Sequence, residues 1–97
     1  MGYKIEIRPL ATIEIIEAYD WYELQRTGLG DEFLNELENF NTSLLLNPFS
    51  HSYYDEPVRQ GKINRFPYVL VYEVIETTIV IYSVFMTKRN PDEKRTG

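Results

Sequence analysis

Two consecutive runs near the end of the chain constrain its fold more than any other feature. Tyr68 to Ile75 and Thr78 to Phe85 are both rich in β-branched and aromatic residues, which favour strands. Only Glu76 and Thr77 separate them, so the two runs predict a tight antiparallel hairpin. Both runs are apolar on both faces. We therefore expect one face to pack on other elements and the other to form an open, tyrosine-lined surface.

Two more strands are expected outside this hairpin. Tyr3 to Arg8 alternates apolar with charged residues, which is the period of a half-buried strand, and Pro9 ends it. Val58 to Asn64 is the second, a strand rich in cations. The segment before it, Pro48 to Pro57, is polar and aromatic and is expected to be a loop.

The segment between the first two strands predicts a helical hairpin. From about Ala11 to Arg26, apolar residues recur at three- and four-residue steps and form one stripe. The members of this stripe are Ile13, Ile16, Tyr19 or Asp20, and Leu24. Gly28-Leu29-Gly30 then indicates a turn, and Asp31 is the expected N-cap of a second helix, which stops at Asn47-Pro48. The buried face of that helix is expected to consist of Phe33, Leu37, Phe40 and Leu44.

The order of elements is thus β-α-α-β-β-β. We predict a single α+β domain over residues 1–97, a helical hairpin packed on a mainly antiparallel, four-stranded sheet. A chain of 97 residues can form one hydrophobic core without metal or disulfide bonds. It contains no cysteine, which excludes disulfides, thiolate metal sites and a cysteine nucleophile. We expect no cofactor.

No part of the sequence predicts a membrane segment. The longest apolar run, Val69 to Val84, is broken by Glu73, Glu76 and two threonines. The N-terminal residues MGYKIEIRP lack the apolar core of a signal peptide. We therefore expect a cytoplasmic protein without a membrane partner.

Charge is distributed unevenly along the chain, whose formal net charge is -5 at pH 7. Residues 1–58 carry three Lys or Arg against eleven Asp or Glu, whereas residues 59–97 carry seven against four. Such asymmetry indicates either a half that binds polyanions or acidic partners, or two solvated faces of opposite sign.

The candidate binding residues belong to the positive part of the chain. Arg59, Lys62 and Arg65 lie on or beside the cationic strand. Lys88 and Arg89 lie at the exit of the last strand. If these cations converge, they could bind phosphate or an acidic protein segment, because Arg offers a planar fork and Lys a point charge. The alternative is that they protect an exposed sheet edge from aggregation.

Other chemically distinctive residues carry weaker signals. The only histidine, His51, has no second histidine or cysteine at ligand spacing, so no metal site is predicted. Glu14 and Glu17 have the spacing of a solvated helix face. Trp21 and Tyr22 either close the core or form a contact surface for a partner.

Four strings, in this order, resemble one protein family. They are AYDWYELQRTGLGDEFLNEL, NPFSHSYY, VRQGKINRFPYVLVYEV and VFMTKRNP. Together they cover almost the whole chain and are similar to the RelE/ParE superfamily of bacterial toxins, often labelled plasmid stabilisation proteins. The resemblance implies the toxin of a type II toxin-antitoxin pair, neutralised by a cognate antitoxin. It leaves open a homodimer or a heterotetramer with the antitoxin.

Two mechanisms are implied by this resemblance. RelE-like members cut messenger RNA on the ribosome, and ParE-like members bind and poison DNA gyrase without chemistry. Lys62 and Arg89 stand at places comparable to nuclease cations. However, Val69 replaces an arginine of those nucleases, Asn90-Pro91 and the two acids after it replace a tyrosine, and Met86 stands where many ParE-like sequences have a histidine.

We therefore predict a non-enzymatic, ParE-like inhibitor of DNA gyrase. The alternatives are a RelE-like endoribonuclease that acts on ribosome-bound mRNA, and a non-toxic protein-binding module of the same fold. The sequence pI of about 4.8 fits gyrase better than RNA, because RNA repels an acidic protein. Residues expected to bind the target or the antitoxin are Arg59, Lys62, Arg65, Tyr68, Lys88, Arg89 and Trp21. Catalysis by a nuclease would fall to Lys62, Arg65 and Arg89.

Overall fold

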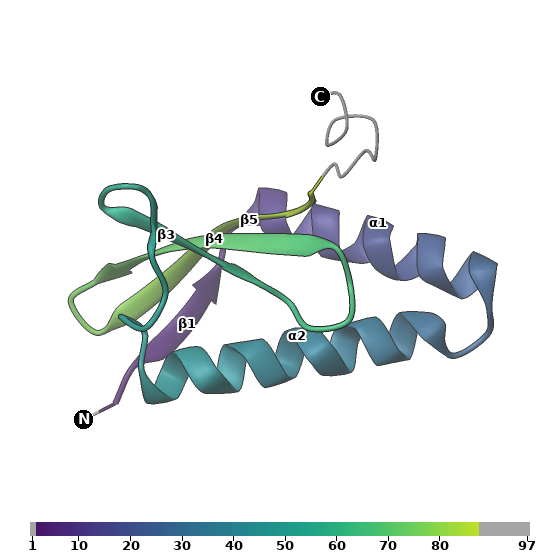
Figure 1. Cartoon of the computed structure of the whole chain (residues 1–97), viewed down its shortest axis with the longest axis horizontal. Helices are drawn as coiled ribbons and strands as arrows, with labels where there is room; N and C mark the ends of the chain where they lie inside the picture. Colours follow the sequence, from purple (N-terminus) through teal and green to yellow (C-terminus); the bar gives the residue numbers. More distant parts are fainter. Residues whose placement is uncertain (1, 88–97) are drawn as a thin grey trace, which may run out of the picture.

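Two helices and five strands make up the part of the chain that the computed structural model describes, residues 2–87. In chain order they are β1 (Lys4–Ile7), α1 (Pro9–Gln25), α2 (Leu29–Leu46), β2 (Tyr53–Asp55), β3 (Val58–Lys62), β4 (Tyr68–Ile75) and β5 (Thr78–Met86). The strand order is β1-β5-β4-β3-β2, and only β1 and β5 run parallel. Figure 1 shows α1 and α2 as an antiparallel pair beside the sheet. The predicted α+β class and helical hairpin are confirmed.

The sheet has five strands, one more than the sequence predicts. The additional strand, β2, lies in the segment that we expected to be a loop. It pairs with β3 through Tyr53 with Arg59 and Asp55 with Val58, and all three of its residues are exposed. Such a short strand with no buried face lacks the alternation by which strands are found in a sequence.

The hairpin of β4 and β5 forms as predicted, and β5 extends one residue further, to Met86. The two strands pair from Tyr68 with Met86 to Ile75 with Thr78. Glu76 adopts the positive φ, 56°, that a tight hairpin turn requires. The long pairing makes this hairpin the centre of the sheet.

Helix α1 buries a different face from the one predicted. Its buried residues are Ala11, Ala18 and Tyr22, with Ile15 partly buried. The predicted stripe points outward instead, since Ile13, Ile16 and Leu24 are 53%, 54% and 83% exposed. The small side chains of the alanines let the helix approach the rest of the core closely, which larger residues at these positions would prevent. No helix in residues 2–87 is long and apolar enough to cross a membrane.

Helix α2 buries the predicted residues Phe33, Leu37, Phe40 and Leu44. Its start was predicted wrongly, because the helix begins at Leu29 and its N-cap is Gly28, not Asp31. Gly28 has a φ of 93°, which glycine adopts without steric cost. Glu23 of α1 accepts hydrogen bonds from the backbone N–H groups of Gly28 and Gly30 at 3.0 to 3.1 Å. A carboxylate from the preceding helix thus replaces a local cap.

Four aromatic rings join the helices to the sheet. Tyr22 of α1 and Phe33 of α2 meet Phe66, which precedes β4, and Tyr68 of β4. The ring centroids are 4.9 Å apart for Tyr22 and Phe66 and 5.1 Å apart for Phe33 and Tyr68. Edge-to-face contacts of this kind contribute about 0.5 to 1.5 kcal/mol per pair beyond burial. This aromatic cluster fixes α1 over the C-terminal end of β5.

Gly61 of β3 provides a test of the packing between the sheet and α2. A Cβ atom at this position would lie 2.5 Å from Cζ of Phe40 and 2.9 Å from Nδ1 of His51. We expect Gly61→Ala to lower the free energy of unfolding by about 1 to 3 kcal/mol, measured by urea denaturation. Gly2→Ala is the control, since its Cβ would meet no atom within 4 Å. Equal stability of the two variants would contradict this packing.

Candidate binding surface

Arg59 holds the loop after α2 against β3. Its guanidinium donates to the backbone oxygen of His51 at 2.6 Å and to the hydroxyl of Tyr53 at 3.1 Å. The same group stacks on the Tyr53 ring, 4.2 Å from the centroid, and lies 5.3 Å from that of Phe49. These contacts occupy most of the donors of the side chain, so Arg59 acts within the fold.

Lys62 and Arg65 also have partners inside the chain. The Lys62 ammonium donates to the backbone oxygens of Ile63 and Phe66, both at 3.2 Å. Arg65 forms ion pairs with Glu32 at 2.8 Å and Glu36 at 3.7 Å, both on α2. The three cations therefore bind three different parts of the protein and do not form a common anion site.

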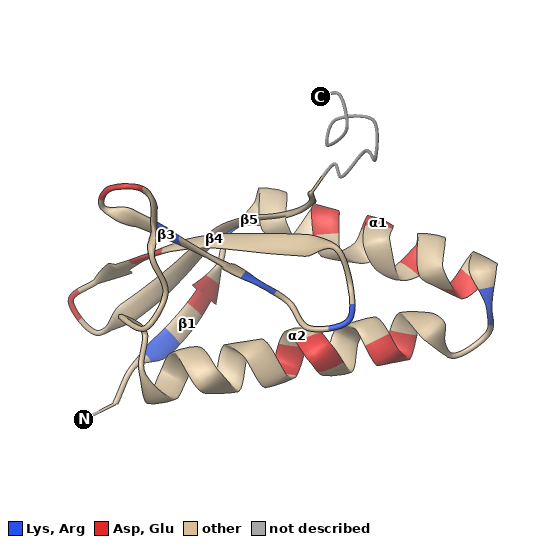
Figure 2. Cartoon of the chain, viewed as in Figure 1, with Lys and Arg blue, Asp and Glu red and all other residues tan. Residues whose placement is uncertain are grey.

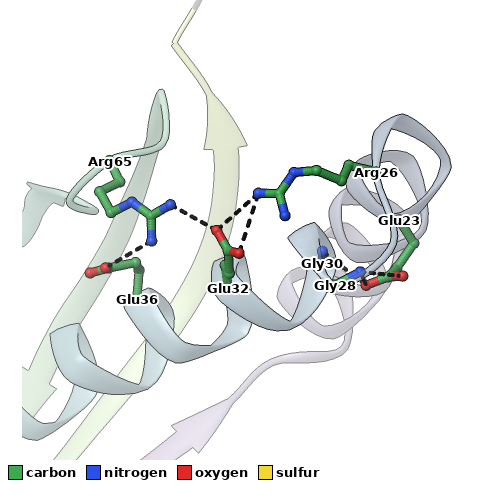
Figure 3. Close-up of polar contacts among 7 residues, drawn as sticks. All are labelled: Glu23, Arg26, Gly28, Gly30, Glu32, Glu36 and Arg65. Atoms are coloured by element: carbon green, nitrogen blue, oxygen red, sulfur yellow. Dashed lines mark hydrogen bonds and ion pairs between the residues drawn. The ribbon is translucent and has the colours of Figure 1, made fainter.

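Glu32 is the centre of an ion-pair network on α2. Figure 3 shows Arg26 and Arg65 reaching its carboxylate from opposite sides, at 3.2 and 2.8 Å. The hydrogen bond from Arg65, and then that from Arg26, lower the pKa of Glu32 from its ordinary value of 4.5. The contact with Glu32 raises the pKa of Arg65 in turn. Arg65 is about half exposed, so the pairs add little to stability.

The charge asymmetry predicted from the sequence is visible in the structure. Neither α1 nor α2 contains Lys or Arg, whereas each carries four carboxylates. Figure 2 shows acidic residues along both helices and scattered cations on β1, β3 and the connections. Lys88 and Arg89 lie outside the described residues. The described surface with the most uniform charge is therefore the acidic helical layer.

Two predicted binding residues, Trp21 and Tyr68, meet in a groove between α1 and the end of β5. The groove, which we call the α1/β5 groove, has a volume of about 400 Å³ and is also lined by Glu14, Glu17 and Met86. Trp21 is 50% exposed there and stands edge-on to the buried Tyr22, with centroids 5.1 Å apart. Burial raises the pKa of Tyr68 above 10.0, so its hydroxyl stays protonated. Of these two adjacent aromatic residues, Tyr22 thus packs in the core and Trp21 lines the groove.

Glu14 is a groove residue that the sequence predicts to be solvated. One of its carboxylate oxygens accepts hydrogen bonds from the Ser83 hydroxyl and the Val84 backbone N–H, both at 2.8 Å. Spacing along α1 predicts a solvated face for Glu14. Its contacts with Ser83 and Val84, which lie 69 and 70 positions later, leave no signal in the local sequence. The structure instead places it against β5.

His51 lies in a smaller polar cavity of about 210 Å³, together with Glu36 and Lys62. Its ring stacks on Phe40, with centroids 5.0 Å apart. Burial, and then the positive charge of Arg59, lower the pKa of His51 from 6.5. The imidazole is therefore neutral at pH 7. Within residues 2–87, no three His, Asp or Glu side chains gather closely enough to hold a metal ion.

Comparison with solved structures finds the same arrangement in bacterial toxin-antitoxin systems. A chain of the chromosomal ParDE system from P. aeruginosa matches with a TM-score of 0.77 and 14% identity, over 89% of this chain and 97% of that one. The fold is that of the ParE and RelE toxins. The isolated E. coli RelE toxin gives 0.72 and 19% identity, over 97% and 94%. A chain of the intact E. coli RelBE complex gives 0.70 and 21%, over 90% and 99%.

The resemblance to RelE/ParE proteins that the sequence predicts is confirmed for the fold. No family model matches the sequence, and no curated protein matches it. With identities of 14% to 21%, the shared property is the fold.

The network at Glu32 predicts a pH-dependent stability. Because folding lowers the pKa of Glu32, the carboxylate stabilises the fold above pH 4.5, and this contribution is lost as the pH falls through the lowered value. We expect Glu32→Gln to be less stable than the natural protein near neutral pH, with a difference that disappears in acid. Urea denaturation across this range measures it. Glu38→Gln, on the same helix, is the control, and a pH-independent difference for Glu32→Gln would refute the network.

The single histidine allows a direct test of its surroundings. We expect the NMR titration of the His51 ring to have its midpoint below 6.5, because burial and Arg59 both oppose protonation. Arg59→Gln should raise this midpoint but leave it below 6.5, since burial is the larger cause. Arg8→Gln, which removes a cation from the end of β1, should not change it. A midpoint at or above 6.5 in the natural protein would show that the ring is solvated.

Proposed function

We propose that this chain is the toxin of a type II toxin-antitoxin system, acting in the cytoplasm as a ParE-like, non-enzymatic inhibitor of DNA gyrase that a cognate antitoxin neutralises. The observation that carries the proposal is the RelE/ParE fold, shared with the ParDE system over 89% of the chain. The preference for gyrase over RNA rests on the family strings together with the missing nuclease residues, since Val69 stands in place of an arginine and Asn90-Pro91 in place of a tyrosine.

The environment of the described cations supports inhibition by binding over RNA cleavage. Cleavage of RNA requires cations that are available to the reacting phosphate and its developing charge. Arg59 and Lys62 instead donate to backbone oxygens, and Arg65 is paired with two carboxylates. The acidic helices and the formal net charge of -5 also oppose close approach to RNA.

Growth of bacteria that express the chain without its antitoxin tests this proposal. We expect induction to arrest growth and to accumulate cleaved complexes of gyrase with DNA, detected by gel electrophoresis of the trapped DNA. A double variant, Lys62→Ala with Arg65→Ala, should keep this toxicity provided that its circular dichroism matches the natural protein. Toxicity that survives in this variant would indicate a mechanism that does not require these two cations to contact a phosphate.

Two other outcomes would refute gyrase inhibition. Ribosome-dependent cuts in translated mRNA, mapped by primer extension and lost in the double variant, would establish a RelE-like endoribonuclease. Normal growth together with a stable complex with the protein encoded by the adjacent reading frame would establish a non-toxic binding module.

A further inference from the structure

β2 is the last strand at one end of the sheet, and its outer edge has no partner strand in residues 2–87. The backbone N–H of Gln60 donates to the oxygen of Ser52 at 3.0 Å. Because bonded and non-bonded residue pairs alternate along antiparallel strands, the next pair, Tyr53 with Arg59, is a non-bonded one. The N–H and C=O groups of Tyr53 therefore point away from β3, toward the open edge.

This edge lacks the usual protection against pairing with another strand. Exposed edge strands commonly carry Lys or Pro, which discourage further pairing. β2 consists of Tyr53, Tyr54 and Asp55 and contains neither of them. All three residues are exposed, so an incoming strand can reach the edge.

The surface beside this edge is apolar and free of charge. Residues 39–54 contain no Lys, Arg, Asp or Glu, although these residues make up 26% of the chain. Figure 1 shows the end of α2, which leads into β2, at the end of the molecule opposite the α1–α2 turn. The segment presents five large side chains that are 40% to 82% exposed and that we call the β2 patch: Leu45, Leu46, Phe49, Tyr53 and Tyr54.

Arg59 holds the aromatic part of the β2 patch in place. Its guanidinium lies 4.2 Å from the centroid of the Tyr53 ring and 5.3 Å from that of Phe49. Phe49 in turn meets Tyr3 edge-on, with centroids 6.3 Å apart. These rings are ordered before any partner binds, which lowers the entropic cost of association.

We propose that two copies of the chain associate through the β2 patch, with their β2 strands antiparallel across a two-fold axis at Tyr53. The N–H and C=O groups of each Tyr53 pair with those of the other copy, and the two sheets become continuous. The apolar side chains of the two patches cover each other. A two-fold axis requires a surface that is complementary to itself, which an antiparallel strand edge provides.

The distribution of charge favours a second copy over other occupants of the patch. Two chains of net charge -5 repel each other least where their surfaces carry no charge. A basic segment is attracted by the acidic helices instead, and a nucleic acid is repelled by the chain as a whole. Asp55 stands two residues from the axis, so the Asp55 residues of the two copies lie about 14 Å apart, beyond the Debye length.

Sedimentation equilibrium of the natural protein tests this association. We expect a monomer–dimer equilibrium between about 5 and 500 µM, because a small interface binds weakly. Association should not weaken as the salt concentration rises, since screening reduces the repulsion between two acidic copies.

Two variants of Tyr53 separate the strand edge from the ring. Tyr53→Pro removes the N–H at the axis, and an edge strand tolerates proline where the N–H faces away from its neighbour. Tyr53→Ala removes the ring and keeps the N–H. We expect Tyr53→Pro to dimerise about tenfold more weakly than Tyr53→Ala, because the hydrogen bonds across the axis are lost. Circular dichroism confirms that both variants fold.

Leu46 and Leu24 provide a matched pair of variants for the apolar contact. They are 82% and 83% exposed, so a lysine at either position leaves the core unchanged. Leu46→Lys places like charges in the interface and should weaken dimerisation about tenfold or more. Leu24→Lys, on α1 outside the patch, should not weaken it.

Three results would overturn the proposal. They are a monomer at every concentration, equal dimerisation of Tyr53→Pro and Tyr53→Ala, and equal weakening by Leu46→Lys and Leu24→Lys, which would place the contact on the helices. The proposed function is judged separately by growth. A toxic chain that stays monomeric keeps the function and loses the dimer, whereas a harmless chain that forms this dimer does the reverse.

Discussion

Contact among Tyr22, Phe33, Phe66 and Tyr68 is the interaction on which the rest of the structure depends. It joins one residue from each helix to Phe66, which precedes β4, and to Tyr68, the first residue of β4, and the helix residues are distant from these in sequence. Because Tyr22 is fixed in this cluster, the adjacent Trp21 is held at the wall of the α1/β5 groove. Tyr68 belongs to both the cluster and the groove. The same packing that stabilises the fold therefore shapes its candidate binding surface.

The elements that could be predicted from the sequence are those whose buried residues are large. The buried face of α2 was predicted correctly, because Phe33 and Phe40 stand at regular spacing and are both buried. For the β4–β5 hairpin the sequence predicted the strands but not which face is buried, and Tyr68 and Tyr72 lie in the core and do not line an open surface. The face of α1 was predicted wrongly, because its interface depends on alanines. Alanines at a close helix contact contribute little to the apolar pattern by which a buried helix face is recognised. The larger Ile13 and Ile16 dominated that pattern, although they point outward.

The candidate site could be predicted in part only, since its geometry depends on contacts far apart in the sequence. Arg65 meets Glu32 across 33 positions, and Glu14 meets Val84 across 70. The sequence identified Arg65 as a cation, but it could not show that two carboxylates neutralise it. Trp21 and Tyr68 were both named as binding candidates, but only the fold shows that they line the same groove.

The distribution of charge between the two layers has a consequence for the orientation of the molecule. The helices carry eight carboxylates and no Lys or Arg. Arg26 and Arg65 pair with only two of these carboxylates, so the helical layer is predominantly negative. Long-range electrostatic forces turn such a protein before it touches a polyanion. A nucleic acid or another polyanion would therefore be approached with the helices turned away. The acidic layer would thus orient the protein electrostatically, so that the side away from the helices faces the polyanion before any specific contact forms.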